Sequence, residues 1–220
     1  IMEGERSTEV QLDLFVRIRS TYYYNDSSQY RVSLKIGESR KYVVRSIDRL
    51  IRAIVQQEPL YFGKQFTFDP TRHYFSPSSR RVIDFFIRIH EIEKQANWSG
   101  HAGILKGREV QLSGELFKRL LLESKGYPFT LEMDRQLFRG ITVTESELPL
   151  RFSLQESAEG LILKLQDDAG IKPLTKECDL VLHGEQIFYL PATPQKDLCQ
   201  LLQAQKKIAG GDLQLKKTQK

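Results

Sequence analysis

The chain has 220 residues, of which 40% are hydrophobic and 28% are charged, with a formal net charge of +5. This composition is ordinary for a globular protein with a buried core, and it excludes a mostly disordered chain. No uncharged stretch approaches the ~20 apolar residues of a membrane helix, and residues 1–6 lack the apolar core of a signal peptide. Two cysteines, Cys178 and Cys199, make neither a disulfide framework nor a zinc cluster. We therefore expect a cytoplasmic protein without membrane contact.

The positive charge is distributed unevenly along the chain. The charge balance is +5 over residues 1–110, −4 over 111–197 and +4 over 198–220. Together with the secondary-structure pattern described below, this charge distribution predicts two halves. Residues 1–110 form a basic half with a strand hairpin and two helices, and residues 111–208 form a half with a helix, a β-meander and a C-terminal helix. A flexible basic tail (209–220) follows. One continuous domain over both halves is the alternative.

Alternating side chains predict the strands. Val10, Leu12 and Leu14 alternate with polar residues in a first strand over 9–19, and residues 30–36 alternate in the same way. The turn-forming segment between them predicts a hairpin. Further short strands are expected at 41–44, 110–112, 129–133, 137–143, 150–154, 161–165, 180–182 and 187–190.

Capping residues and helical spacing predict about four helices, each after a short strand. Ser46 caps the first, and the second begins at Ser76-Pro77. The third follows Ser113 and the last follows Thr193-Pro194. Apolar residues at helical spacing give the first helix one buried face: Ile47, Leu50, Ile51, Ile54 and Val55. The predicted fold class is α+β, with mostly antiparallel, hairpin-linked short strands.

The sequence contains no recognisable catalytic constellation. Gly63-Lys64 comes nearest to a phosphate-binding loop, but Glu58 occupies the first glycine position and Gln65 replaces the hydroxyl residue. The four histidines lack metal-ligand spacing, and no Gly-x-Ser-x-Gly elbow is present. We therefore expect no catalytic residue, no metal and no cofactor in this segment.

Basic residues gather around the first predicted helix. Arg45, Arg49 and Arg52 recur at i, i+4 and i+7, which predicts a stripe opposite the apolar face. Arg40 and Lys41 precede the same helix. Such a stripe can bind phosphates without reading base sequence. A solvated helix face and a contact with a neighbouring domain are the other interpretations of this pattern.

Several short segments resemble a known family. Arg40-Lys41-Tyr42-Val43-Val44-Arg45-Ser46-Ile47 joins a Tyr-Val-Val strand to a helix. Phe62-Gly63-Lys64-Gln65-Phe66 follows, and then His73-Tyr74-Phe75. With Val110-Gln111-Leu112 and Ile187-Phe188-Tyr189, they make residues 30–205 similar to the helicase-associated domain found upstream of the ATPase core in bacterial Swi/Snf-type proteins.

The resemblance implies a parent protein that couples ATP hydrolysis to movement on double-stranded DNA. This segment would be its non-catalytic accessory domain, with the adjoining ATPase/helicase domain and duplex DNA as partners. ATP and Mg²⁺ would belong to the ATPase core. The motif residues are then expected to be structural: Phe62, Gly63, Lys64, Phe66, His73 and Phe75. A protein–protein interaction module with no nucleic-acid contact is the alternative.

Overall fold

The computed structural model describes residues 8–19, 29–95, 103–149, 152–157, 160–165, 171–175, 177–190, 197 and 213–216. The chain forms two compact units, Ile1–Thr142 and Val143–Lys220. All of the candidate binding residues lie in the first unit. Over the described part of the chain, no helix is long and apolar enough to cross a membrane.

A long antiparallel hairpin forms the centre of the first unit. It joins β1 (Thr8–Arg19) to β2 (Gln29–Gly37), which confirms the predicted hairpin. Its register sets apolar side chains opposite one another: Leu12 and Ile36, Leu14 and Leu34, Val16 and Val32, Ile18 and Tyr30. Each of these side chains is at most 4% exposed. Since burial of a large apolar side chain contributes about 1.5–3 kcal/mol, this face anchors the unit.

The sheet around this hairpin is mixed. Two strands pair with β1 in parallel, β6 (His73–Phe75) at its start and β8 (Phe129–Met133) nearer its end. The antiparallel neighbours are β3 (Tyr42–Val43) and β7 (Val110–Leu112) on β2, and β9 (Gln136–Thr144) on β8. The prediction of mostly antiparallel, hairpin-linked strands is therefore wrong, because β6 and β8 reach β1 through long crossover connections that contain helices.

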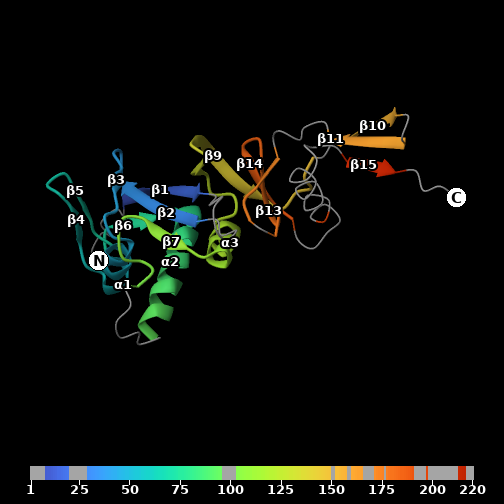
Figure 1. Cartoon of the computed structure of the whole chain (residues 1–220). Helices are drawn as coiled ribbons and strands as arrows, with labels where there is room; N and C mark the ends of the chain where they lie inside the picture. The colour runs from blue at the N-terminus through green and yellow to red at the C-terminus, as the bar shows by residue number, and fades with distance from the viewer. Residues whose placement is uncertain are drawn as a thin grey trace. The chain divides into compact units, whose positions relative to one another are not determined.

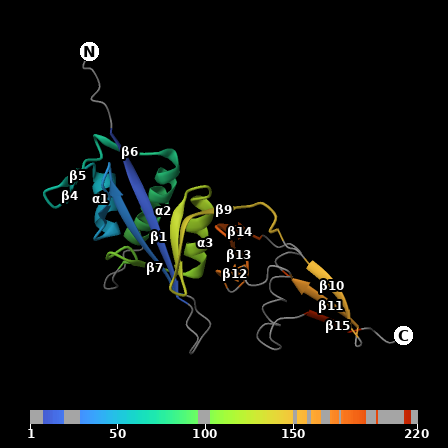
Figure 2. The same cartoon turned by 90° about the horizontal axis from the view of Figure 1, so that it is seen from above.

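Three helices lie on the same side of the β1–β2 hairpin (Figures 1 and 2). They are α1 (Ile47–Gln56), α2 (Pro77–Gln95) and α3 (Gly114–Glu123). Ile51, Phe86 and Leu120, one from each helix, are completely buried. Tyr30 of β2 stacks on Phe117 of α3 with ring centroids 4.2 Å apart, so α3 packs directly on the buried sheet face.

The helix caps agree with the sequence, whereas the helix count does not. Ser46 and Ser113 each accept a hydrogen bond at 3.3 Å, from the backbone N–H groups of Arg49 and Leu116, which confirms both as N-caps. The described residues contain three helices, so the prediction of about four is wrong for them. Of the helix expected after Thr193-Pro194, only Asp197 is among the described residues.

The boundary between the units falls later than the division at residue 110 that the sequence favoured. Residues 111–142 belong to the first unit because β7 pairs with β2 and β8 pairs with β1.

The hairpin of β4 (Leu60–Phe62) and β5 (Phe66–Phe68) forms a small two-stranded sheet of its own. The first unit therefore combines the mixed sheet, three helices and this hairpin.

The second unit is built from antiparallel strands. One meander contains β12 (Ile171–Pro173), β13 (Leu180–His183) and β14 (Gln186–Tyr189). A second sheet contains β10 (Phe152–Ser157), β11 (Gly160–Leu165) and β15 (Leu213–Lys216). The buried Cys178 packs in an apolar cluster with Leu148, Val181, Phe188 and Leu190. The strand β15 lies within the 209–220 segment that the sequence predicts as a tail.

A buried tyrosine fills the space between the two parallel neighbours of β1. On this side, β6 pairs with residues 8–10 and β8 with residues 15–18, so Leu12 faces no described strand there. The Tyr127 hydroxyl donates a hydrogen bond to the Leu12 carbonyl oxygen. Burial raises the pKa of Tyr127 to about 12, although a hydrogen bond from the Ser79 side chain opposes the shift.

We expect Tyr127→Phe to lower the free energy of unfolding by about 1–2 kcal/mol at pH 8, because the Leu12 carbonyl loses its buried partner. The raised pKa also makes stability pH-dependent. Between pH 10 and 12 the unfolded chain releases the phenolic proton while the folded chain keeps it, so stability falls as pH rises. The free energy of unfolding of the variant, measured with urea, should therefore fall less steeply over this range than that of the wild type. Tyr61→Phe, at a side chain 73% exposed, should behave like the wild type.

Candidate functional site

The candidate binding residues surround the beginning of α1, where the backbone donors are already occupied. Ile47 N–H donates to the Gly107 carbonyl oxygen at 3.3 Å, and Asp48 N–H donates to the Leu105 carbonyl oxygen at 3.1 Å. The Ser46 side chain takes the Arg49 N–H. An anion here therefore cannot use the free amides that usually make a helix N-terminus attractive. Any positive charge at this place must come from side chains.

The family-like motif forms one aromatic cluster beside this helix start. Tyr42 of β3 stacks on Phe66 of β5, with centroids 5.4 Å apart and an interplanar angle of 7°. The cluster continues through successive ring contacts: Phe62 with Phe66, Phe66 with His73, His73 with Phe68, and Phe68 with Phe75. Lys64 stands exposed in the turn of the hairpin. The cluster attaches the β4–β5 hairpin to β3 and β6.

His73 is fixed in this cluster by two polar contacts. Its Nδ1 accepts a hydrogen bond from the Asp69 N–H at 2.9 Å, so the ring proton lies on Nε2. Nε2 is 3.2 Å from the Glu38 Oε1 carboxylate oxygen, to which it can donate. A hydrogen bond from the Thr71 side chain, with one from its backbone, lowers the pKa of the half-buried Asp69. The histidine thus has a packing role at the base of the hairpin.

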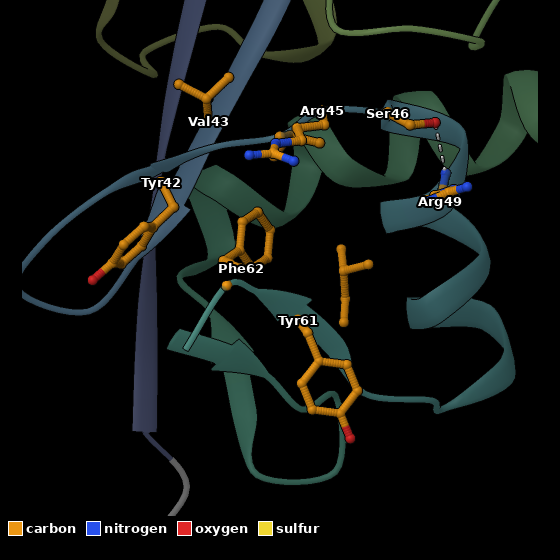
Figure 3. Close-up of a pocket in the computed structure, with 10 residues that line it drawn as sticks. Tyr42, Val43, Arg45, Ser46, Arg49, Tyr61 and Phe62 are labelled. Atoms are coloured by element: carbon orange, nitrogen blue, oxygen red, sulfur yellow. Dashed lines mark hydrogen bonds between the residues drawn. The ribbon is translucent and has the colours of Figure 1, made fainter. Parts of the chain in front are cut away.

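A pocket of about 390 Å³ lies between β3, the start of α1 and the β4–β5 hairpin. Figure 3 shows Arg45 reaching from the start of α1 toward Tyr42 and Phe62, with Tyr61 at the opposite end. Most of the remaining lining lacks polar side chains: Val43, Val44, Leu60 and Gly63. Ser46 and Arg49, at the start of α1, complete it. The pocket therefore combines an apolar wall with two guanidinium groups.

Arg45 and Arg49 differ from the neighbouring basic residues in their surroundings. Both are exposed, and neither side chain has an ion-pair partner within the described part of the chain. By contrast, Lys41 Nζ is 2.5 Å from Asp13 Oδ1, and Arg52 pairs with Asp48 one turn earlier in the helix. Hydrogen bonding to Asp48 raises the pKa of Arg52. Two of the candidate cations are therefore neutralised.

The predicted arginine stripe is shorter than the spacing suggests. Arg45 precedes the N-cap and so is not on the helix, because α1 begins at Ile47. Arg40 lies over the Tyr42 ring, with its guanidinium carbon 5.6 Å from the ring centroid. The structure brings Arg45 and Arg49 to the same pocket as Phe62 and Gly63 of the motif.

Sequence reasoning did not identify Leu60 and Tyr61 as members of this site. Alternation along β4 is the signal that could have indicated exposure of Tyr61, since this residue lies between two half-buried residues and is itself 73% exposed. Tyr61 therefore presents an exposed ring beside the half-buried aromatic cluster.

The described residues contain no group of three or more histidine, cysteine or acidic side chains that could hold a metal ion. Besides His73 and Glu38, a second histidine–carboxylate pair is formed by His90, whose Nδ1 is 3.4 Å from Asp48 Oδ1. Asp48 also accepts from Arg52 and is only 8% exposed. This carboxylate is therefore already in contact with Arg52 and His90 within the fold.

We expect Gly63→Ala to lower the free energy of unfolding by about 1 kcal/mol, because Gly63 has φ of +68° and a Cβ there is strained. A Cβ at Gly63 would meet no atom within 4 Å, so the effect isolates backbone conformation. Gly114→Ala is the matched control. It lies in the first turn of α3, where its Cβ would meet Tyr30 at an ordinary 3.7 Å. Equal destabilisation in both variants, measured by urea unfolding, would contradict the expectation.

The comparisons with known proteins give one family. Residues 108–220, just over half of the chain, match the family described as "Bacterial SNF2 helicase associated". The match begins after the pocket residues and includes β7, α3, β8 and the whole second unit. No significant match to a curated protein or to a solved structure was found. The chain belongs to the bacterial SNF2 helicase-associated family.

Proposed function

We propose that this chain is a non-catalytic accessory region of a bacterial SNF2-type helicase and that it adds a sequence-independent contact to duplex DNA. The adjoining helicase domain would bind ATP and Mg²⁺ and hydrolyse the nucleotide, and this region would pack on that domain. Family membership supports the association with the helicase. The DNA contact is an inference from the residues around α1.

The observation that carries the DNA contact is the pair of arginines at the pocket. Arg45 and Arg49 are exposed, and neither has a carboxylate partner within the described part of the chain. A guanidinium presents its N–H donors in a planar fork that matches a phosphate, and the charge is permanent at physiological pH. Two unneutralised guanidinium groups on one surface are suited to successive phosphates of a DNA strand.

This contact is expected to be weak and dependent on salt. Each neutralised phosphate contributes about 0.9 to the slope of log affinity against log salt concentration on duplex DNA. Two arginines therefore account for a slope of only about 2. A contact of this size cannot hold DNA alone, but it can add to the affinity for DNA of a helicase domain that is already bound.

A second function, protein binding without DNA contact, has its own supporting feature. The sheet face opposite the helices carries the half-buried Phe15 beside a set of internal ion pairs. Arg17 pairs with Glu109 at 2.9 Å and with Glu132 at 3.1 Å. Because these charges balance one another, the face offers little attraction to phosphates. An aromatic ring within a neutral polar face is better suited to a protein surface.

We expect replacement of both pocket arginines, Arg45→Gln with Arg49→Gln, to lower affinity for a short duplex about tenfold at low salt. The salt slope should fall by about 2, because two phosphate contacts are lost. The measurement is fluorescence anisotropy with a labelled duplex across a salt series. The control is Arg80→Gln with Arg119→Gln, which removes equal charge from arginines paired with Asp84 and Glu123. An unchanged slope in the pocket variant would remove these arginines from the function.

The protein-binding function makes a different prediction. Phe15→Glu should weaken a complex with the parent's isolated helicase core about tenfold or more, because it places a charge in the centre of the open sheet face. Gln11→Glu adds the same charge at an exposed position of the same strand and should have little effect. Calorimetric titration measures both. If Phe15→Glu binds the core as well as the wild type does, this face is not the interface.

A further inference from the structure

The pocket is more apolar than a phosphate contact on duplex DNA requires. Phosphates of a duplex meet a protein at its surface and need only donors and positive charge. Here Arg45 and Arg49 border a pocket of about 390 Å³ whose walls include Val43, Leu60 and Phe62. Pockets of this size commonly bind a small organic ligand. Stacked base pairs cannot enter it, because both faces of each base are covered by their neighbours.

We propose that this pocket binds one unpaired nucleotide, with the base against the apolar wall and an adjacent phosphate on Arg45 and Arg49. This inference rests on the proposed nucleic-acid contact at the same place and deepens it. The preferred ligand is single-stranded DNA, or an unpaired nucleotide at a junction. Duplex DNA would reach only the two arginines at the pocket.

The aromatic residues of the site differ in whether a ring face is free. Tyr42 is stacked on Phe66, and Arg40 also lies over its ring, so this ring already has two partners. Phe62 is tilted against both Tyr42 and Phe66 at centroid distances of 6.2 and 5.5 Å. Tyr61 is 73% exposed and has no ring partner within the described residues. Tyr61 is therefore the ring on which a base can stack.

The charge and the shape of the pocket together favour a nucleotide. An aliphatic ligand would leave the arginines without partners, and a free phosphate would leave the apolar wall exposed. A nucleotide has both an aromatic ring and an adjacent anion, and aromatic stacking with a basic border is the usual way in which proteins hold single strands. A peptide with alternating acidic and aromatic residues shares these properties, and it is the competing ligand in the test.

The test compares three oligonucleotides with the whole chain: a twelve-nucleotide thymidine strand, an abasic strand of the same length and charge, and a duplex. We expect the thymidine strand to bind at least about fivefold more tightly than the abasic strand, because stacking adds to phosphate binding. Tyr61→Ala should lower affinity for the thymidine strand by about 5- to 30-fold. The abasic strand and the duplex should bind this variant as they bind the wild type. Tyr61→Phe keeps the ring and should retain the thymidine preference.

The outcomes separate this inference from the proposed function. Equal binding of thymidine and abasic strands, with no effect of Tyr61→Ala, would overturn the nucleotide pocket. Salt-dependent duplex binding would still stand in that case. If none of the three oligonucleotides binds at low salt, the nucleic-acid contact itself fails. A Glu-Tyr copolymer that binds more tightly than the thymidine strand and loses affinity in Tyr61→Ala would assign the pocket to a protein ligand and overturn the inference.

Discussion

The burial of alternate side chains along β1 determines where the rest of the first unit can lie. Every second residue from Val10 to Ile18 is at most 4% exposed, so one face of the strand must be covered along its whole length. The helices supply that cover, and β2 on one side and β6 and β8 on the other supply the backbone partners. Where the two parallel strands leave a gap, the Tyr127 hydroxyl satisfies the Leu12 carbonyl. A single strand thus links segments more than a hundred residues apart.

The candidate site is a consequence of this arrangement. Pairing of β3 with β2 fixes Tyr42 and Val43, and the carbonyl groups of Leu105 and Gly107 hold the beginning of α1. Because those carbonyls occupy the helix amides, the positive charge available to a ligand comes only from the guanidinium groups. Among the basic residues around α1, Lys41 and Arg52 have acidic neighbours. Arg45 and Arg49, which have none within the described residues, lie beside an apolar pocket, and both proposals depend on them.

Local features of the fold could be predicted from the sequence because they depend on neighbouring residues. The alternation in β1 and β2 and the Ser46 and Ser113 caps are of this kind. The parallel pairing of β1 with β6 and β8 could not, because alternation is the same in parallel and antiparallel strands and the partners are distant in the sequence. Val55, predicted to lie on the buried face of the first helix, is 51% exposed, since helical spacing does not say how wide the covered face of a helix is.

The candidate site was predictable only in part for the same reason. Spacing identified Arg45, Arg49 and Arg52 as a group. It did not show that Arg52 differs from the other two by its ion pair with Asp48. Lys41 likewise meets Asp13, twenty-eight residues earlier, across the sheet. The aromatic motif was recognised as a pattern of letters, whereas its ring contacts unite β3, β5 and β6. Tyr61 could not be predicted as a site residue, because the exposure of a strand residue depends on which other segments cover it.

The pocket and the first part of the family match, residues 108–142, lie in different parts of the sequence but share one folded unit. The match begins at residue 108, whereas the pocket lies between Tyr42 and Gly63. Its first segment supplies β7, α3 and β8, which pair with β2, pack on Tyr30 and pair with β1. The sheet that carries β3 and α1 is therefore completed by residues of the matched segment. A chain that kept residues 108–142 without the preceding strands would leave the apolar faces of α3 and β8 uncovered.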